Sequence, residues 1–500
     1  MFKDISAKSA VVMEASSARF RAIHESGVGV AVMLAGSLFL SFILVMNNGN
    51  VALGAGFIAI VAVVLITIYR LDWGFYLFIA SFLVFDNVNL GGFDPWTFKV
   101  GYMMTLNVLV PGLAVGALTP MEIHMLFIIL VWVLLIALKK DVHVQKPFLS
   151  VSANLFFLSL VVMFVIGIAT GGEALKALWD IRAMLYLVVI YLFVPQVITT
   201  KNQIHVVMWV CIGSLAFKAA QAAARFIGSG FSMGGYRALA GNEDPILMIP
   251  LLVFLAAMVI FGSRSGQRTT LWILLPTFVL GFYAANRRAA YISLLVCGAA
   301  FTLLLTAEVR AKALKLIAPL VVLFAVYLVM SWNSPSAEFA QAVKSAFVTD
   351  PQSLRRDDYT SNLARDQENY NLAVTYQRLP LGLGFGKKHD WAILNWGNFQ
   401  LRGYVTHNQI LWLLVKSGPV GFFLFLLFMN LALFRGAAIF SALRDPYLMV
   451  VCAACIIFVL DQIIMSYVDM GLTRFRCTAF LGLLLGLFPA IQRADQVQTH

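Results

Sequence analysis

The sequence predicts an all-α membrane protein, a polytopic helix bundle of about 14 spans. Of its 500 residues, 61% are hydrophobic and only 12% are charged, whereas soluble proteins are about half apolar and about a quarter charged. Apolar runs of about 17–21 residues, long enough to cross a hydrocarbon core of about 30 Å, recur along the whole chain. The formal net charge of +12 indicates cytoplasmic loops rather than nucleic-acid binding, because no basic stripe is interleaved with aromatic residues.

The apolar runs place the spans in order. They lie near 27–46, 51–69, 121–138, 152–170, 181–199, 204–224, 246–262, 270–285, 289–306, 313–331, 447–467 and 472–489. The run at 73–85 is short but can span, and the run at 407–434 is long. Ser417-Gly418-Pro419 should divide the long run into a half-helix and a full helix, since glycine and proline interrupt helices. Pro111 and nearby glycines make 100–119 ambiguous between a re-entrant and an interfacial segment.

Charge in the loops predicts the orientation. Basic loops at 139–146, 262–270, 308–315 and 435–446 fall on one side, which the positive-inside rule makes cytoplasmic. The predicted parts are a cytoplasmic tail over 1–26, a first bundle part over 27–331, a periplasmic loop over 332–406, a last bundle part over 407–490 and a cytoplasmic tail over 491–500. The long outer loop is polar and partly helical in pattern, and such a loop on a rigid bundle is usually functional.

Polar residues on the predicted outer side indicate an anion site. They are Arg237 before a span, Arg287 and Arg288 in a short link, the glycine-rich turn "RLPLGLGFG" at 378–386, and Thr406-His407-Asn408 at the start of the half-helix. Arginine near lipid is costly unless it pairs or faces a cavity, and guanidiniums at one depth repel each other unless an anion joins them. Because the guanidinium fork suits phosphate, we expect a phosphorylated, lipid-borne ligand.

Each feature also has a structural interpretation. The two linked arginines can anchor to headgroups, and Arg237 can pair with Glu243 or Asp244 in its own loop. The glycines can make only a tight turn. His407 can be an interfacial hydrogen-bonding residue and Asn408 a helix cap. The shared sidedness of all these residues favours the site.

Four stretches resemble motifs of the bacterial O-antigen ligases and related polysaccharide polymerases. "YRALAGNEDP" (236–245) resembles their Arg-x-x-Gly-type segment before a span. "ANRRAAYISLLV" (285–296) resembles their Ser-Arg-Gly-like start of a span, with Arg288 as the matching arginine. "RLPLGLGFG" resembles their Pro-x-x-Gly-x-Gly turn, and "THNQILWLLVKSGPVG" (406–421) matches their His-Asn-x-x-Leu…Gly-x-x-Gly signature. The sequence departs from the family at Asn286 and Arg287, and in the acidic "GNEDP".

The resemblance implies a metal-independent, inverting glycosyltransferase of the bacterial inner membrane with a GT-C-like fold, no cofactor and a periplasmic active site. Its donor would be a glycan on undecaprenyl diphosphate. Its acceptor would be another lipid-linked glycan in a polymerase or lipid A core in a ligase. The polar 86–99 stretch and the long outer loop can frame a second sugar chain, which favours the polymerase.

The chemistry assigns roles to the residues. A diphosphate leaves as a stable anion, so the site must supply positive charge rather than a general acid. We expect Arg288 and Arg237 to supply it, with help from Arg287 or Arg402, and His407 to act as base or to position the acceptor hydroxyl. The other expected substrate contacts are Asn408, Arg378 and Glu243.

A transporter or flippase of a lipid-linked glycan is the alternative from another class. Transporters carry ionisable groups near the bilayer midplane, and the candidates here are Lys218 and Asp461. Each of them can instead snorkel or bond to a neighbouring helix, which is the interpretation we favour.

Overall fold

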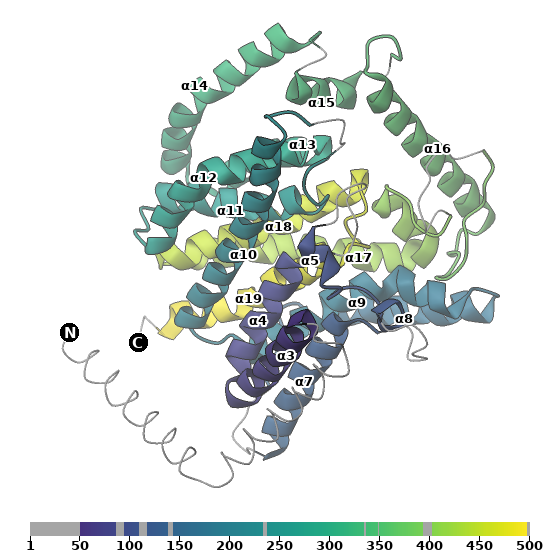
Figure 1. Ribbon diagram of the computed structural model, residues 1–500. Coiled ribbons are helices and arrows are strands. Elements are labelled where there is room, and N and C mark those ends of the chain that lie inside the picture. Colours follow the sequence, from purple (N-terminus) through teal and green to yellow (C-terminus); the bar gives the residue numbers. More distant parts are fainter. Residues whose placement is uncertain are drawn as a thin grey trace. The chain divides into compact units, whose positions relative to one another are not determined.

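The computed structural model describes residues 51–86, 95–109, 118–138, 144–233, 238–334, 337–348, 350–393 and 403–497. All regular secondary structure in these residues is helical (Figure 1). Seven of these helices are long and apolar enough to cross a membrane, which agrees with the predicted helical membrane protein. The predicted span at 27–46 and the N-terminal tail lie outside the described residues.

The described helices follow the predicted apolar runs closely. They are α3 (Val51–Tyr69), α4 (Leu71–Val84), α5 (Trp96–Lys99), α6 (Leu106–Leu109), α7 (Pro120–Leu138), α8 (Ser150–Ala169), α9 (Ala174–Val197), α10 (Lys201–Gly228), α11 (Asp244–Ile260), α12 (Gly266–Ala284), α13 (Arg288–Leu304), α14 (Ala307–Ser331), α15 (Glu338–Phe347), α16 (Arg356–Arg378), α17 (Gln409–Ala442), α18 (Pro446–Val468) and α19 (Phe475–Val497). The chain divides into two compact units, Met1–Gly74 and Phe75–His500. All the polar clusters described below belong to the second unit.

Helix α9 begins earlier than its predicted span. It begins at Ala174, whereas the apolar run begins at 181. Lys176 and Asp180 interrupt the apolar pattern, but the helix continues through them because Asp180 is buried and accepts a hydrogen bond from Lys416 Nζ at 3.0 Å. Of the ambiguous stretch at 100–119, the described part forms only the short helix α6.

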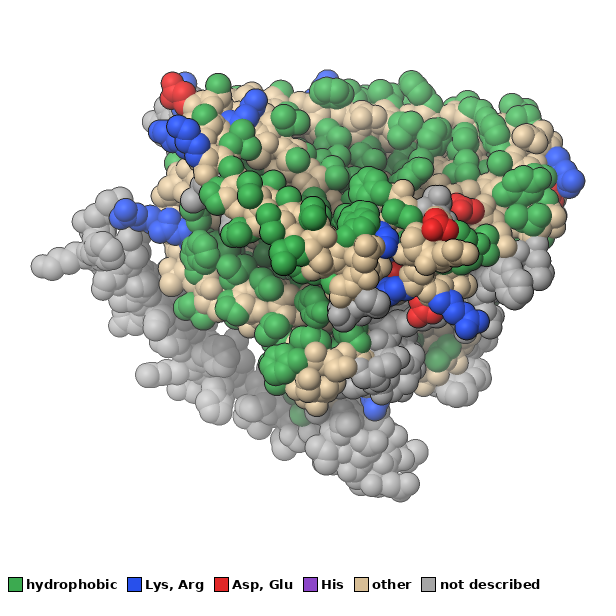
Figure 2. Space-filling model, turned by 90° about the horizontal axis from the view of Figure 1, so that it is seen from above, with side chains coloured by type: hydrophobic (Ala, Val, Ile, Leu, Met, Phe, Trp, Pro, Cys, Tyr) green, Lys and Arg blue, Asp and Glu red, His purple; other side chains and the backbone are tan. Residues whose placement is uncertain are grey.

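Helix α18 lies at the centre of the second unit (Figure 1). It packs against α11, α13, α17 and α19, while α19 also packs along α9. The apolar window of α18 is 78% buried, but that of α7 is only 17% buried. Large apolar side chains such as Leu130 and Val165 are exposed on the outer helices, and Figure 2 shows green apolar atoms over much of the visible face. An apolar surface of this kind fits a lipid environment.

The expected break in α17 is present at Gly418, whose φ is 66° and which precedes Pro419. The glycine-rich turn enters this break, since Leu383 N donates to Val415 O at 2.7 Å. The turn also packs against α8, where a Cβ added to Gly167 would lie 2.0 Å from the carbonyl oxygen of Phe385. Gly418 and Gly167 therefore allow the backbones of α17 and α8 to approach the glycine-rich turn closely.

Replacing Gly167 with alanine should destabilise the protein. The new methyl group must displace the backbone at Phe385, and such overpacking costs about 1–3 kcal/mol. The melting temperature of the purified protein in detergent measures the effect. Gly213→Ala is the matched control, because a Cβ there meets nothing within 4 Å. Equal melting temperatures for the two variants would contradict the close packing.

Candidate functional site

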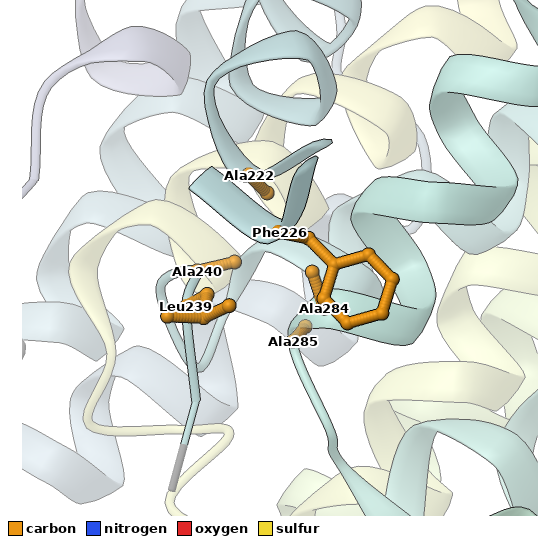
Figure 3. Packing of buried hydrophobic residues seen from close by; sticks show 6 residues of the cluster. All are labelled: Ala222, Phe226, Leu239, Ala240, Ala284 and Ala285. Carbon is orange, nitrogen blue, oxygen red and sulfur yellow. The ribbon is translucent and has the colours of Figure 1, made fainter. Parts of the chain in front are cut away.

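A small apolar cluster holds two of the predicted site segments together (Figure 3). The ring of Phe226, near the end of α10, lies beside Ala284 and Ala285 at the end of α12, with Leu239 close by. Leu239 N donates to Ala284 O at 2.9 Å. Arg225 Nη1 donates to Leu239 O at 2.9 Å. These contacts hold the segment before α11 against the link between α12 and α13.

Asp469 joins this link to the link between α18 and α19. Its carboxylate lies 3.7 Å from Arg287 Nη1 and 3.1 Å from Arg474 Nη2. Burial alone would raise the pKa of Asp469, but Arg474, Arg287 and His407 together lower it below its usual value. Burial lowers the pKa of Arg287 to about 10. Asp469 opposes this decrease, and the neighbouring arginines add to it. Arg287 is therefore cationic at neutral pH, and its side chain remains 26% exposed.

Arg288 contacts the outer helices α15 and α16. Its Nη1 donates to Ser345 Oγ at 2.8 Å and lies 3.3 Å from Asp358 Oδ1. Arg365, also on α16, interacts electrostatically with both Arg287 and Arg288. Within the described ranges, its Nε has no hydrogen-bond partner. Like charges near one another repel, and the carboxylates of Asp469 and Asp358 offset the repulsion at Arg287 and Arg288.

His407 is held by Glu368 of α16. The Glu368 carboxylate accepts a hydrogen bond from His407 N at 2.9 Å, and its Oε2 lies 3.0 Å from His407 Nδ1. Glu368 is buried, whereas the His407 side chain is 29% exposed. A carboxylate at Nδ1 favours the neutral tautomer that carries its proton on that atom and a lone pair on Nε2. The pair thus has the arrangement of an oriented general base.

Glu243 and Asp244 face inward, into a buried ionic network. Glu243 is 3% exposed, and its oxygens lie 3.9 Å from Arg474 and 3.9 Å from Arg476. Arg476 Nη1 donates to Asp244 Oδ1 at 2.7 Å. Lys218 Nζ donates to both oxygens of Asp86 at 2.8 Å and lies 3.5 Å from Asp244. Burial raises the pKa of Glu243, and the two arginines oppose that rise.

The structure describes two of the other four predicted site residues. Arg237 and Arg402 lie outside the described residues. Asn408 caps α17, since its Oδ1 accepts from Leu411 N at 3.0 Å. Arg378 is 67% exposed at the end of α16, where it pairs with Asp390 at 3.1 Å.

Glu243 and Arg378 have protein partners, and their expected contacts with substrate stay predictions. Glu243 faces Arg474 and Arg476 in the protein interior, because a buried carboxylate is stable only beside cations. Arg378 lies ten residues beyond Glu368, about 15 Å along the helix.

Several residues of the site were not predicted from the sequence. They are Asp358, Arg365 and Glu368 on α16, and Asp469, Arg474 and Arg476 between α18 and the first turn of α19. The α16 residues recur at spacings of seven and three, which place them on one face of a helix. Arg474 and Arg476 adjoin an apolar run, where an arginine is costly unless it pairs or faces a cavity. Their position beside that run was therefore a signal in the sequence.

No family model and no curated protein matches this chain. The family resemblance therefore stays a prediction, and the function is argued from the residues of the site.

Replacing Lys218 with methionine should strongly destabilise the protein. The change leaves Asp86 and Asp244 buried with less positive charge, and breaking a buried ion pair costs about 3–5 kcal/mol. Melting temperature in detergent reports the loss. Lys312→Met, on the exposed side of α14, is the control. The double variant Lys218→Met/Asp86→Asn should recover part of the stability, and no recovery would contradict the pairing.

Proposed function

We propose that this protein is a membrane glycosyltransferase that takes a glycan from undecaprenyl diphosphate and transfers it to a sugar hydroxyl. The observation that carries the proposal is that Arg287 and His407 both interact with Asp469, while Arg365 interacts with Arg287 and Arg288 and Glu368 holds His407. This reaction requires cations that hold the diphosphate. It also requires an oriented base. The family resemblance of the segments with Arg288 and His407 supports the same activity.

The arginines act on the leaving group. As the bond between the anomeric carbon and the diphosphate oxygen breaks, negative charge develops on that oxygen. Arg288 and Arg287, already held by Asp358 and Asp469, stabilise this charge without rearrangement. Arg365 on α16 adds a third guanidinium.

His407 acts on the acceptor. Its Nε2 takes the proton of the attacking hydroxyl while the oxygen bonds to the anomeric carbon from the face opposite the diphosphate. Glu368 holds the ring and stabilises the imidazolium that forms. Attack from the opposite face inverts the anomeric configuration.

The proposed enzyme is a GT-C-like bundle of about 14 spans in a bacterial inner membrane. Its proposed site lies on the periplasmic side. Helices α15 and α16 would then form the periplasmic cover of the site. We favour a polymerase of exopolysaccharide or O-antigen repeat units over a ligase to lipid A core, because the long outer loop offers room for a second glycan.

The transporter alternative is less well supported. Its two candidate groups have protein partners, since Lys218 bonds to Asp86 and Asp461 Oδ1 accepts a hydrogen bond from Ser293. Buried hydrogen bonds of this kind hold helices together. An assay with purified protein, lipid-linked glycan and acceptor in detergent distinguishes the classes: new glycosidic linkage identifies the enzyme, and long ladders on a gel identify the polymerase.

Arg288→Ala should abolish transfer while the protein stays folded and inserted, because one charge-stabilising donor contributes about 10²–10³ in rate. Initial rates of glycan transfer in detergent measure it. Arg264→Ala, in the link between α11 and α12, is the control variant. A near-normal rate for Arg288→Ala would end the assignment of the diphosphate to this arginine.

Glu368→Gln should slow transfer by about 10²-fold, the usual contribution of an oriented base. Glutamine keeps the size of the side chain but not its charge, so the imidazolium of His407 loses its counterion. Initial rates of glycan transfer in detergent measure the effect. His407→Ala should also slow transfer strongly, and a normal rate in this variant would reduce His407 to a helix-end residue.

A further inference from the structure

Three lysine ammonium groups converge on the ring of Tyr404. Lys176 Nζ lies 5.8 Å, Lys388 Nζ 5.5 Å and Lys416 Nζ 5.8 Å from the ring centroid. Tyr404 itself is buried, and its hydroxyl donates to Glu173 Oε1 at 2.6 Å. Lys176 comes from the first turn of α9, and Lys388 follows the glycine-rich turn, so segments far apart in sequence build this basic surface.

The local carboxylates do not balance these cations. Lys416 is buried and neutralised by Asp180 at 3.0 Å, and it interacts electrostatically with Lys387. Lys176, Lys387 and Lys388 form no ion pair within the part of the chain that the structure describes. We call these three residues the lysine patch. Of the other carboxylates nearby, Glu173 bonds to Tyr404, Asp390 pairs with Arg378 and Glu368 pairs with His407, so the patch keeps an excess of positive charge.

His389 lies next to the lysine patch and lacks polar partners. It is 3% exposed, and neither ring nitrogen has a hydrogen-bond partner among the described residues. Burial lowers the pKa of His389 to about 4, so at neutral pH the ring is uncharged, with one donor and one acceptor. A buried imidazole without partners is costly, unless a ligand supplies them.

The patch adjoins the proposed base. His389 interacts electrostatically with both Lys416 and Glu368, and Glu368 holds His407. His407 in turn interacts with Asp469, the partner of the arginines. His407 therefore interacts, through Glu368 and Asp469, with groups that belong to both the lysine region and the arginine region.

We propose that the lysine patch and His389 form a subsite for an acidic glycan, a sugar chain whose carboxylates lie against the lysines and whose hydroxyls bond to His389. The inference rests on the proposed function, because it assigns the sugar chain to the side of His407 away from the arginines. Sugar hydroxyls both donate and accept hydrogen bonds, as the neutral His389 ring requires, and carboxylates supply the negative charge for the lysines. A phospholipid headgroup is the other source of negative charge, and the vesicle measurement below distinguishes it.

The test is direct binding to the full-length protein in detergent. Tetragalacturonate, a carboxylated chain, should bind at least about tenfold more tightly than neutral maltotetraose, and added salt should weaken only the former. The double variant Lys176→Gln/Lys388→Gln should lose this preference. Lys312→Gln/Lys315→Gln, two lysines on α14, is the charge-matched control and should keep it. His389→Phe should weaken binding of both chains.

Three results would overturn the subsite. They are equal binding of the two chains to the wild-type protein, unchanged binding in the double variant, or a double variant that loses only binding to phosphatidylglycerol vesicles. Failure of the subsite can be distinguished from failure of the proposed function. If Arg288→Ala abolishes transfer while the double variant binds tetragalacturonate normally, only the subsite fails. If Arg288→Ala leaves transfer intact while the patch variants lose binding, only the diphosphate assignment fails.

Discussion

The arrangement of the site depends on one buried carboxylate, Asp469, between two guanidiniums. Arg287 comes from the link between α12 and α13, and Arg474 from the link between α18 and α19. A buried charge costs several kcal/mol unless it is paired, so the two links cannot separate without leaving Asp469 with Arg474 alone. This requirement holds the start of α13 close to the end of α18.

A second ionic network supports the first. Arg474 and Arg476 are two residues apart, and both face Glu243, while Arg476 also reaches Asp244. Asp244 lies 3.5 Å from Lys218 of α10. The helix ends near the site are thus tied together by alternating charges, which holds the arginines in place before any ligand arrives. Prearranged charge of this kind stabilises a developing anion better than charge that must reorient.

Helix α16 gives the site its chemistry. One of its faces carries Asp358, Arg365 and Glu368, which orient Arg288, add a cation and hold His407. The proposed base is therefore complete only when the outer segment packs on the membrane helices. Helix α16 also bonds to the segment that follows Lys388 and His389, because Asp390 N donates to Thr375 Oγ1 at 2.8 Å and Ile393 N donates to Asn371 Oδ1 at 2.9 Å.

The sequence by itself determined the helical membrane class, most helix positions and the break at Gly418, because hydrophobicity and backbone freedom are local properties. It also singled out Arg287, Arg288 and His407, since charge beside an apolar run is costly wherever the helix packs. It could not assign Glu368 to His407 or Asp469 to Arg287. Those partners are distant in the chain, and only the packing of helix ends decides which charges meet. For the same reason Glu243 turned out to be buried and Arg378 exposed: burial of a charged side chain is decided by its tertiary partners.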